Sequence, residues 1–194
     1  LPIFMPKGLQ LRRTFENFLI SEKEKCGYTF VWTPHIAKTD LYVRSGHLSK
    51  YDAMYAPMEI DDESYVLKAM NCPHHFQIYN DKKRSYRELP MRLAENGTVY
   101  RYEKSGELNG LFRCRALTID DTHIFVRNDQ ILNEYSSVIS LIKHVFTKLG
   151  FKKYRVRISI RDEKHESKYM GNPKLWDHAE REIVEATKQN DLPY

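Results

Sequence analysis

The chain has 194 residues, of which 41% are hydrophobic and 29% charged, a balance that predicts a folded globular protein and argues against a disordered one. Its 31 basic and 26 acidic side chains give a net charge of +5, which permits binding of polyanions without indicating it. The three cysteines are odd in number and far apart, so we expect no disulfide framework and a cytosolic, reducing environment. No apolar run is long enough to cross a membrane.

The first half of the chain is expected to contain one long helix, one strand and several short elements. Residues 7–26 carry apolar side chains at helical spacing, which predicts a helix with one buried face that ends at Gly27. Residues 28–33 form a predicted strand that Pro34 ends. Residues 41–56 predict surface loop and short helix. Residues 58–70 predict strands around an acidic turn, and a short helix follows.

The second half is expected to begin with a hairpin, into which residues 89–102 lead. An N-cap at Asn128 or Asp129 starts the clearest amphipathic helix of the chain, which ends at Gly150. Residues 154–161 alternate apolar and polar side chains, which predicts a strand. A last helix is expected to begin at Asn172-Pro173.

The segment from Arg101 to His123 is the most informative part of the sequence. It predicts two extended arms joined by a loop that contains Gly106 and Gly110. Because side chains alternate between the two faces of a strand, each arm would gather charged groups on one face. These groups are Arg101 and Glu103 on the first arm and Arg113, Arg115, Asp121 and His123 on the second. Guanidiniums suit phosphate oxygens, carboxylates accept from amines and imidazoles bind metals, so we expect an anionic, partly aromatic ligand.

Several separated motifs give the chain a resemblance to a known family. The segment from Arg101 to Arg113, with its two glycines, resembles the second signature motif of class II aminoacyl-tRNA synthetases. The first helix, the first strand and Pro34 resemble the first motif. Three further segments of the chain resemble the catalytic domain of threonyl-tRNA synthetases. They are residues 71–75 (Asn-Cys-Pro-His-His), 85–90 (Ser-Tyr-Arg-Glu-Leu-Pro) and 120–123 (Asp-Asp-Thr-His). The motifs occur in the right order, and the resemblance extends to about Trp176.

The resemblance implies an α+β fold with a mostly antiparallel sheet flanked by helices. Residues 1–194 would form a partial catalytic domain that carries the first and second motifs. The third motif, the editing domain and the anticodon-binding domain would be absent. The implied activity is ATP-dependent conversion of threonine to threonyl-adenylate, with Mg²⁺, and transfer to tRNA(Thr). A fragment of this kind is expected to be inactive or impaired on its own.

The resemblance also assigns the nucleotide site. Arg101 matches the family arginine that binds the α-phosphate of ATP and the amino-acid carboxylate, so it is the expected catalytic residue. Glu103 would recognise the amino group of adenine, and Arg113 would reach the γ-phosphate. Leu117 would form an apolar platform beneath adenine. Gly106 and Gly110 would suit an ordinary hairpin turn as well as a nucleotide-binding loop. The assignment of a phosphate-binding site therefore depends on the arginines.

A zinc site is implied by Cys72 and His123, which match the family's metal ligands, with a third histidine outside this chain. Their spacing of roughly fifty residues is not a metal signature in itself. Asp121 and Met70 would contact the substrate amino acid. Zinc suits a threonine enzyme because a site that coordinates a hydroxyl rejects valine, which lacks one. His74 and His75 lie close to Cys72, but the backbone near Pro73 argues against simultaneous coordination, so we expect zinc binding here to be weak or absent.

The implied partners are threonine, tRNA(Thr) and a second copy of the chain through the first motif, and no membrane is expected. An ordinary helix packed on a sheet edge would show the same first-motif pattern. Ala116 and Ile119 depart from residues common in relatives and would reshape the amino-acid pocket. Three alternatives remain: a non-catalytic synthetase-like module for nucleotide binding, tRNA binding or dimerisation, a class II synthetase for proline or serine, and an unrelated zinc domain.

Overall fold

The computed structural model describes residues 2–162, 164, 165, 169 and 171–192. The chain divides into two compact units. The first unit comprises Leu1–Ser85 and Arg92–His123, and the second comprises Tyr86–Met91 and Ile124–Tyr194. Every site residue predicted from the sequence lies in the first unit.

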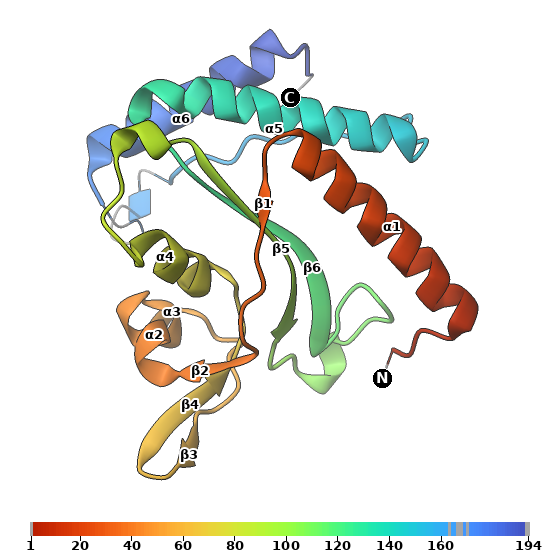
Figure 1. Cartoon of the computed structure of the whole chain (residues 1–194), viewed down its shortest axis with the longest axis vertical. Coiled ribbons are helices and arrows are strands. Elements are labelled where there is room, and N and C mark those ends of the chain that lie inside the picture. The colour runs from red at the N-terminus through yellow and green to blue at the C-terminus, as the bar shows by residue number, and fades with distance from the viewer. Residues whose placement is uncertain (1, 163, 166–168, 170, 193–194) are drawn as a thin grey trace. The chain divides into compact units, whose positions relative to one another are not determined.

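The long first helix is confirmed as α1 (Pro6–Lys25), and the chain leaves it through Gly27, whose φ of 78° favours glycine (Figure 1). The predicted buried apolar face is formed only in part. Phe18 and Leu19 are half-buried, whereas Leu11 is 72% exposed and Phe15 41% exposed. Polar contacts also join the helix to the sheet, where the Lys23 ammonium lies 2.5 Å from the Asp120 carboxylate. Helical spacing predicted the helix, but it could not show which partner covers the apolar side chains.

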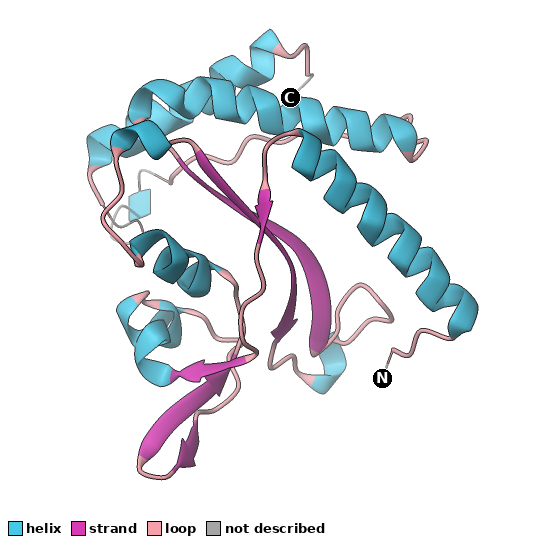
Figure 2. Ribbon diagram, in the orientation of Figure 1, coloured by secondary structure: helices cyan, strands magenta, loops and turns pink. Residues whose placement is uncertain are grey.

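Two three-stranded sheets form the strand part of the first unit (Figure 2). One contains β1 (Thr29–Phe30), β5 (Met91–Tyr100) and β6 (Ala116–Phe125) in the order β1-β5-β6, with β1 parallel to β5. The other contains β2 (Ile36–Lys38), β4 (Glu63–Leu67) and β3 (Met58–Ile60) in the order β2-β4-β3, with antiparallel pairing. The α+β class is therefore confirmed, with a mixture of parallel and antiparallel pairs.

Short helices pack on these sheets. They are α2 (Thr39–Arg44), α3 (His47–Lys50) and α4 (Cys72–Asn80). The 3₁₀ turn η1 (Tyr86–Glu88) belongs to the second unit. The predicted acidic turn joins β3 to β4, where Asp61 and Asp62 both have positive φ. The core of the first unit consists of side chains no more than 1% exposed, namely Tyr42, Val66, Ala69, Leu93, Ala94 and Val99. Burial of such side chains is the main stabilising term of the unit.

The hairpin arms are shorter than predicted. Since β5 ends at Tyr100 and β6 begins at Ala116, the residues Arg101, Glu103, Arg113 and Arg115 lie in the loop. Local hydrogen bonds end the ladder there, because the Glu103 N–H donates to the Arg101 carbonyl at 2.8 Å and the 3₁₀ turn η2 (Ser105–Glu107) follows. The alternation argument was therefore wrong for these four side chains. It holds for Asp121 and His123, which lie on β6.

The second unit contains a pair of helices that pack on each other, α5 (Ile131–Lys148) and α6 (Pro173–Gln189) (Figure 1). A 3₁₀ turn, η3 (Asn128–Gln130), precedes α5, so the predicted side-chain cap at Asn128 or Asp129 was wrong. The cap of α6 is confirmed, because the Asn172 side chain accepts a hydrogen bond from the Lys174 N–H at 2.9 Å.

The strand predicted at residues 154–161 is not formed. An alternating pattern marks a face but does not supply the neighbouring strand that a ladder needs. Arg161, at the end of this segment, instead bonds Glu180 on α6 at 3.0 Å. No helix in the described part of the chain combines the length and the hydrophobicity needed to span a membrane.

Candidate active site

Asp121, one of the residues predicted to contact the amino acid, lies where β6 meets the start of α4. Asn71 precedes α4, and its side-chain amide donates to the Asp121 carboxylate on β6 at 3.0 Å. Asn71 is fully buried against β5 at Gly97, where an added Cβ would lie 2.4 Å from the Asn71 side chain. Glycine is therefore required at this position for the amide to lie flat on the strand. Cys72, the first residue of α4, follows directly.

A second contact ties β6 to α4. Nδ1 of His123 lies 2.9 Å from Nδ1 of His75, and the two rings meet edge to face at 4.6 Å between centroids. Nε2 of His75 in turn lies 3.0 Å from the Glu95 carboxylate on β5. Both ring nitrogens of His75 are thus engaged with other side chains.

Glu95 belongs to a buried polar cluster that the sequence did not reveal. Its carboxylate accepts from the Thr33 N–H at 2.9 Å and lies 3.2 Å from the Lys68 ammonium. The Lys68 ammonium also donates to the Thr33 hydroxyl at 3.0 Å. Lys68, Glu95 and His75 are each no more than 1% exposed. Buried charges of this kind persist only when they are paired and hydrogen-bonded.

The charges of Asp121 and Arg101 both act on the Cys72 thiol. Burial raises the pKa of the Cys72 thiol and the Asp121 carboxylate raises it further, whereas Arg101 acts in the opposite direction. Burial lowers the pKa of His123, an effect that Asp121 opposes and His75 strengthens. His123 is therefore held as the neutral imidazole, the form that ligates metals.

Arg101 is the most unusual side chain of the site. Its Nε is buried and has no hydrogen-bond partner among the residues that the structure describes. The guanidinium carbon lies 6.0 Å from the centroid of the Tyr51 ring, and the backbone N–H donates to the Arg115 carbonyl at 2.9 Å. A buried, unpaired guanidinium nitrogen is costly unless a ligand completes it.

The other predicted nucleotide residues form a self-contained ionic group in the loop. Nε of Arg113 donates to the Glu103 carboxylate at 2.9 Å, and a second guanidinium nitrogen lies 3.7 Å from Glu107. Nε of Arg115 donates to the Glu103 backbone carbonyl at 3.0 Å. Glu103 is only 8% exposed. Any anion that uses Arg113 must therefore compete with Glu103 and Glu107.

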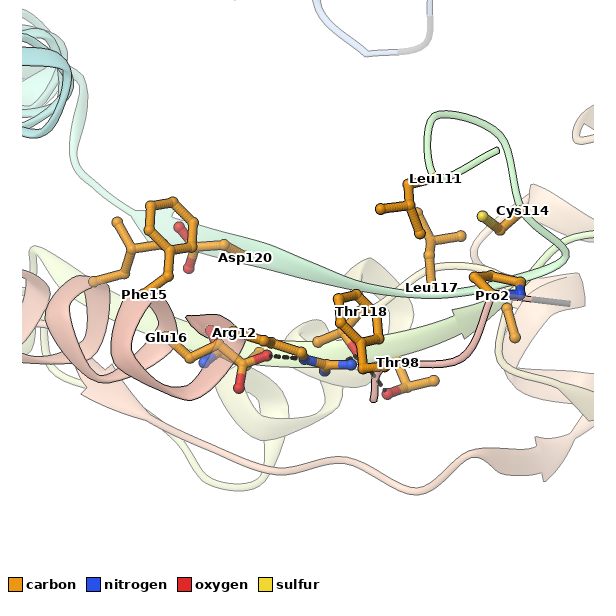
Figure 3. A pocket seen from close by; sticks show the side chains of 14 residues that line it. Pro2, Arg12, Phe15, Glu16, Thr98, Leu111, Cys114, Leu117, Thr118 and Asp120 are labelled. Atoms are coloured by element: carbon orange, nitrogen blue, oxygen red, sulfur yellow. Dashed lines mark hydrogen bonds and ion pairs between the residues drawn. The ribbon is translucent and has the colours of Figure 1, made fainter. Parts of the chain in front are cut away.

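Leu117 and Met70 lie at different places. Leu117 lines a groove of about 590 Å³ between α1 and the hairpin strands, together with Leu111 and Cys114 (Figure 3). In the same groove Arg12 donates to the Thr118 hydroxyl at 2.8 Å. By strand alternation Leu117 falls on the face of β6 that carries Asp121 and His123. The Met70 carbonyl accepts a hydrogen bond from the buried Tyr42 hydroxyl at 3.0 Å.

The donor types available suit zinc. Cys72 and His123 offer a thiol and a neutral imidazole, which are the ligands that zinc prefers. Within the described ranges, no three His, Cys, Asp or Glu side chains gather closely enough to hold a metal by themselves. A third ligand would have to join Cys72 and His123.

The buried cluster predicts a pH dependence of stability. Burial alone would raise the pKa of Glu95, but hydrogen bonds from His75 and Thr33 and the charge of Lys68 lower it to about 2. The unfolded chain therefore binds a proton that the folded chain does not between about pH 4.5 and pH 2, and stability falls as the pH falls through this window. The expected loss is about 3 kcal/mol at 1.4 kcal/mol per pKa unit. Urea unfolding at several pH values should show a much smaller acid loss for Glu95→Gln, and equal losses for both proteins would contradict the assignment.

Comparisons with known proteins agree with this geometry. Residues 55–193 match the family model described as tRNA synthetase class II core domain (G, H, P, S and T). A threonine–tRNA ligase of Chlorobium phaeobacteroides is 48% identical over all of this chain, and one of Synechococcus elongatus is 50% identical. The chain spans 30% and 33% of the length of these two curated relatives.

Two solved structures resemble the chain. One, described as the RNA binding domain of threonyl-tRNA synthetase from Cryptosporidium parvum, is 32% identical with a TM-score of 0.89, over 97% of this chain and 46% of that one. A prolyl-tRNA synthetase of Giardia lamblia in complex with prolyl-adenylate has a TM-score of 0.67 at 18% identity, over 75% of this chain and 31% of that one. The second likeness concerns the fold alone.

Proposed function

Because the chain belongs to the tRNA synthetase class II core domain family, we propose that it forms part of the catalytic core of a threonine-tRNA ligase. In this proposal ATP activates threonine to threonyl-adenylate, and the threonyl group then passes to tRNA(Thr). The specificity for threonine is supported by the ligases that match the whole chain at 48% and 50% identity. Three free cysteines suit a reducing, cytoplasmic setting.

The observation that carries the proposal is the unpaired Arg101. Its buried Nε has no partner in the described part of the chain, although its charge is felt by Cys72. An anion with oxygens in a fork would complete the guanidinium. The α-phosphate of ATP and the carboxylate of threonine are two such groups, and adenylation brings them together.

The proposed chemistry needs no side-chain nucleophile. A carboxylate oxygen of threonine attacks the α-phosphorus of ATP, and the bond to the bridging oxygen breaks to release pyrophosphate. Arg101 would stabilise the negative charge that develops on the α-phosphate oxygens, and Mg²⁺ would neutralise the leaving phosphates. A terminal ribose hydroxyl of the tRNA then attacks the threonyl carbonyl, and AMP leaves. Catalysis would come from position and charge.

The loop would bind ATP by exchanging partners. Glu103 and Glu107 now hold Arg113. When the γ-phosphate takes Arg113, the Glu103 carboxylate becomes free to accept from the amino group of adenine. The loop ion pairs thus keep both side chains in place before the nucleotide arrives. Leu117 would form the apolar wall beneath adenine.

Cys72 and His123 would hold zinc, together with a ligand that lies outside the set described here. Bound zinc would supply coordination positions for the amino and hydroxyl groups of threonine. Asp121, fixed by the Asn71 amide at 3.0 Å, would accept a hydrogen bond from the threonine hydroxyl. Met70, whose carbonyl is held by Tyr42, would close the pocket.

The test of the proposed function is amino-acid-dependent ATP–pyrophosphate exchange, measured in the longest natural form of the protein that carries this sequence. Exchange should require threonine and should be lower with valine by a factor of about 10⁴, because valine leaves the polar groups of the site unpaired. Exchange driven by proline or serine in preference to threonine would contradict the proposal. Nucleotide binding without any exchange would favour a non-catalytic module.

Asp120 and Asp121 offer a matched pair for the selectivity of this site. Asp120 pairs with Lys23 on α1, whereas Asp121 contacts Asn71 beside Cys72. We expect Asp121→Asn to reduce the preference for threonine over valine about 10- to 100-fold, the value of one charged hydrogen bond. Asp120→Asn should leave the preference unchanged. Equal effects of the two variants on the ratio of kcat/KM values would count against the assignment.

We also propose that two copies of the chain associate through α1. Large apolar side chains remain exposed on this helix and on the residues before it, including Ile3, Met5, Leu9, Leu11 and Phe15. A patch of this kind marks a protein interface, and a second copy matches the implied partner. Leu11→Glu should convert the dimer to monomer in sedimentation velocity, whereas Leu175→Glu on α6 should not. A wild-type monomer at micromolar concentration would refute the association.

A further inference from the structure

A line of hydrogen bonds runs from the interior of the first unit to His123. It passes from Lys68 to Glu95 at 3.2 Å, from Glu95 to His75 at 3.0 Å and from His75 to His123 at 2.9 Å. Each link joins nitrogen or oxygen atoms whose ability to donate is restricted. The positions of the protons can therefore be worked out from one end of the line.

Glu95 determines which atom donates in each hydrogen bond of this line. The Lys68 ammonium and the Thr33 N–H can only donate, and they meet one carboxylate oxygen of Glu95 at 3.2 Å and 2.9 Å. The Thr33 hydroxyl accepts from Lys68, so its own proton is donated to the Glu95 carboxylate, whose two oxygens lie 2.9 Å and 3.1 Å away. Glu95 is thus surrounded by donors and is ionised, in accord with its lowered pKa. Nε2 of His75, 3.0 Å from Glu95, must carry a proton.

The surroundings of His75 determine its charge. Its side chain is fully buried, and the charges of Lys68 and Glu95 already cancel. A second proton on His75 would add an uncompensated charge to this cluster, which costs several kcal/mol in a buried site. His75 is therefore the neutral Nε2–H form, and its Nδ1 carries a lone pair. Because Nδ1 of His75 accepts, the partner atom Nδ1 of His123 must donate.

We propose that Glu95 and His75 are positioning residues that hold His123 as the Nδ1–H tautomer and leave its Nε2 unprotonated. Edge contacts with the rings of His75 and Phe76, at 4.6 Å and 6.4 Å between centroids, fix the plane of the imidazole. A histidine that must ligate a metal through one nitrogen is usually held through the other. The use of Nε2 for zinc rests on the proposed function, whereas the tautomer itself does not.

The tautomer can be read directly in the metal-free chain. Long-range ¹H–¹⁵N correlation spectra of the ¹⁵N-histidine-labelled protein distinguish protonated from unprotonated ring nitrogens. We expect a protonated Nδ1 and a bare Nε2 for His123, with the reverse for His75. The opposite pattern at His123 in the wild-type protein would overturn the inference, and this result does not depend on any variant folding.

Two adjacent histidines on α4 give a matched control. His74 is buried like His75, but neither of its nitrogens has a partner among the described residues. His75→Phe should release His123 from the single tautomer, visible as a large ¹⁵N shift of its ring nitrogens, and His74→Phe should leave those signals in place. An unchanged His123 spectrum in His75→Phe would overturn the positioning role.

A metal titration separates this inference from the proposed function. In the longest natural form of the protein, His75→Phe should weaken zinc binding about 10- to 100-fold in competition with a chelator. His74→Phe should change the zinc affinity less than about threefold, within the variation of remote sites. Equal affinity in the wild type and His75→Phe would overturn the role of His75. If the wild-type protein binds no zinc, the proposed metal site fails, and the tautomer measurement alone decides the inference.

Discussion

Replacing Arg101 by alanine is expected to lower the rate of threonine-dependent ATP–pyrophosphate exchange about 100- to 1000-fold. The reason is that the buried Nε of Arg101 has no hydrogen-bond partner in the described structure and would be completed by the reacting α-phosphate. A donor that is aimed at developing charge in a water-poor site typically contributes a factor of this size to kcat. Arg101→Lys should restore only part of the rate, because an ammonium lacks the planar fork that matches two oxygens.

The matched control for this prediction is Arg181→Ala, which removes an exposed guanidinium from α6. It should leave exchange within about twofold of the wild type, as expected for a surface substitution away from the site. If Arg101→Ala raised KM for ATP but left kcat unchanged, Arg101 would bind substrate and transition state equally. That outcome would contradict its role in stabilising the transferred phosphorus.

Replacing Lys68 by methionine is expected to destabilise the first unit by about 3–5 kcal/mol. The substitution keeps the side-chain length but leaves the Glu95 charge buried without its cationic partner. Removal of one member of a buried ion pair costs this much because the other charge stays uncompensated. Urea unfolding measures the loss, and a Trp176→Phe background leaves Trp32 as the fluorescent probe, which lies next to Thr33 in the first unit.

Lys38→Met serves as the control, because Lys38 also pairs with a glutamate, Glu63, but both side chains are exposed. The unfolding midpoint of this variant should remain close to that of the wild type, since exposed pairs are solvated and screened. Similar losses in Lys68→Met and Lys38→Met would mean that the buried cluster is not a special source of stability.

The regular elements were predictable where one local pattern suffices. The helix at α1 and the pair α5 and α6 followed from three- and four-residue spacing, and the turn at Asp61 and Asp62 followed from acidic residues between strands. Local patterns could not predict which other segment each helix or strand packs against. Leu11 and Phe15 of α1 were expected to be buried but are exposed, and residues 154–161 alternate without forming a strand.

Local patterns likewise predicted the positions of only some side chains of the site. Asp121 and His123 were placed on one face of a strand, and β6 confirms this. Arg101 and Glu103 were assigned to a strand face for a reason that fails, because the ladder ends at Tyr100. The cluster of Lys68, His75 and Glu95 was missed altogether. Its members come from three separate parts of the chain, namely the residue after β4, helix α4 and strand β5, and a charged residue carries no mark in the sequence that it is buried.

The most direct test of the central claim is calorimetric titration of the longest natural form of the protein that carries this sequence with a non-hydrolysable threonyl-adenylate analogue. The analogue presents an adenine, a phosphate mimic and a threonyl group at once, so it should engage Glu103, Arg101 and Asp121 together. We expect saturable one-to-one binding that Arg101→Ala weakens at least 100-fold, and weaker binding of the valyl analogue. Absence of binding by the folded, zinc-loaded wild-type protein, or equal affinity for the two analogues, would contradict the account.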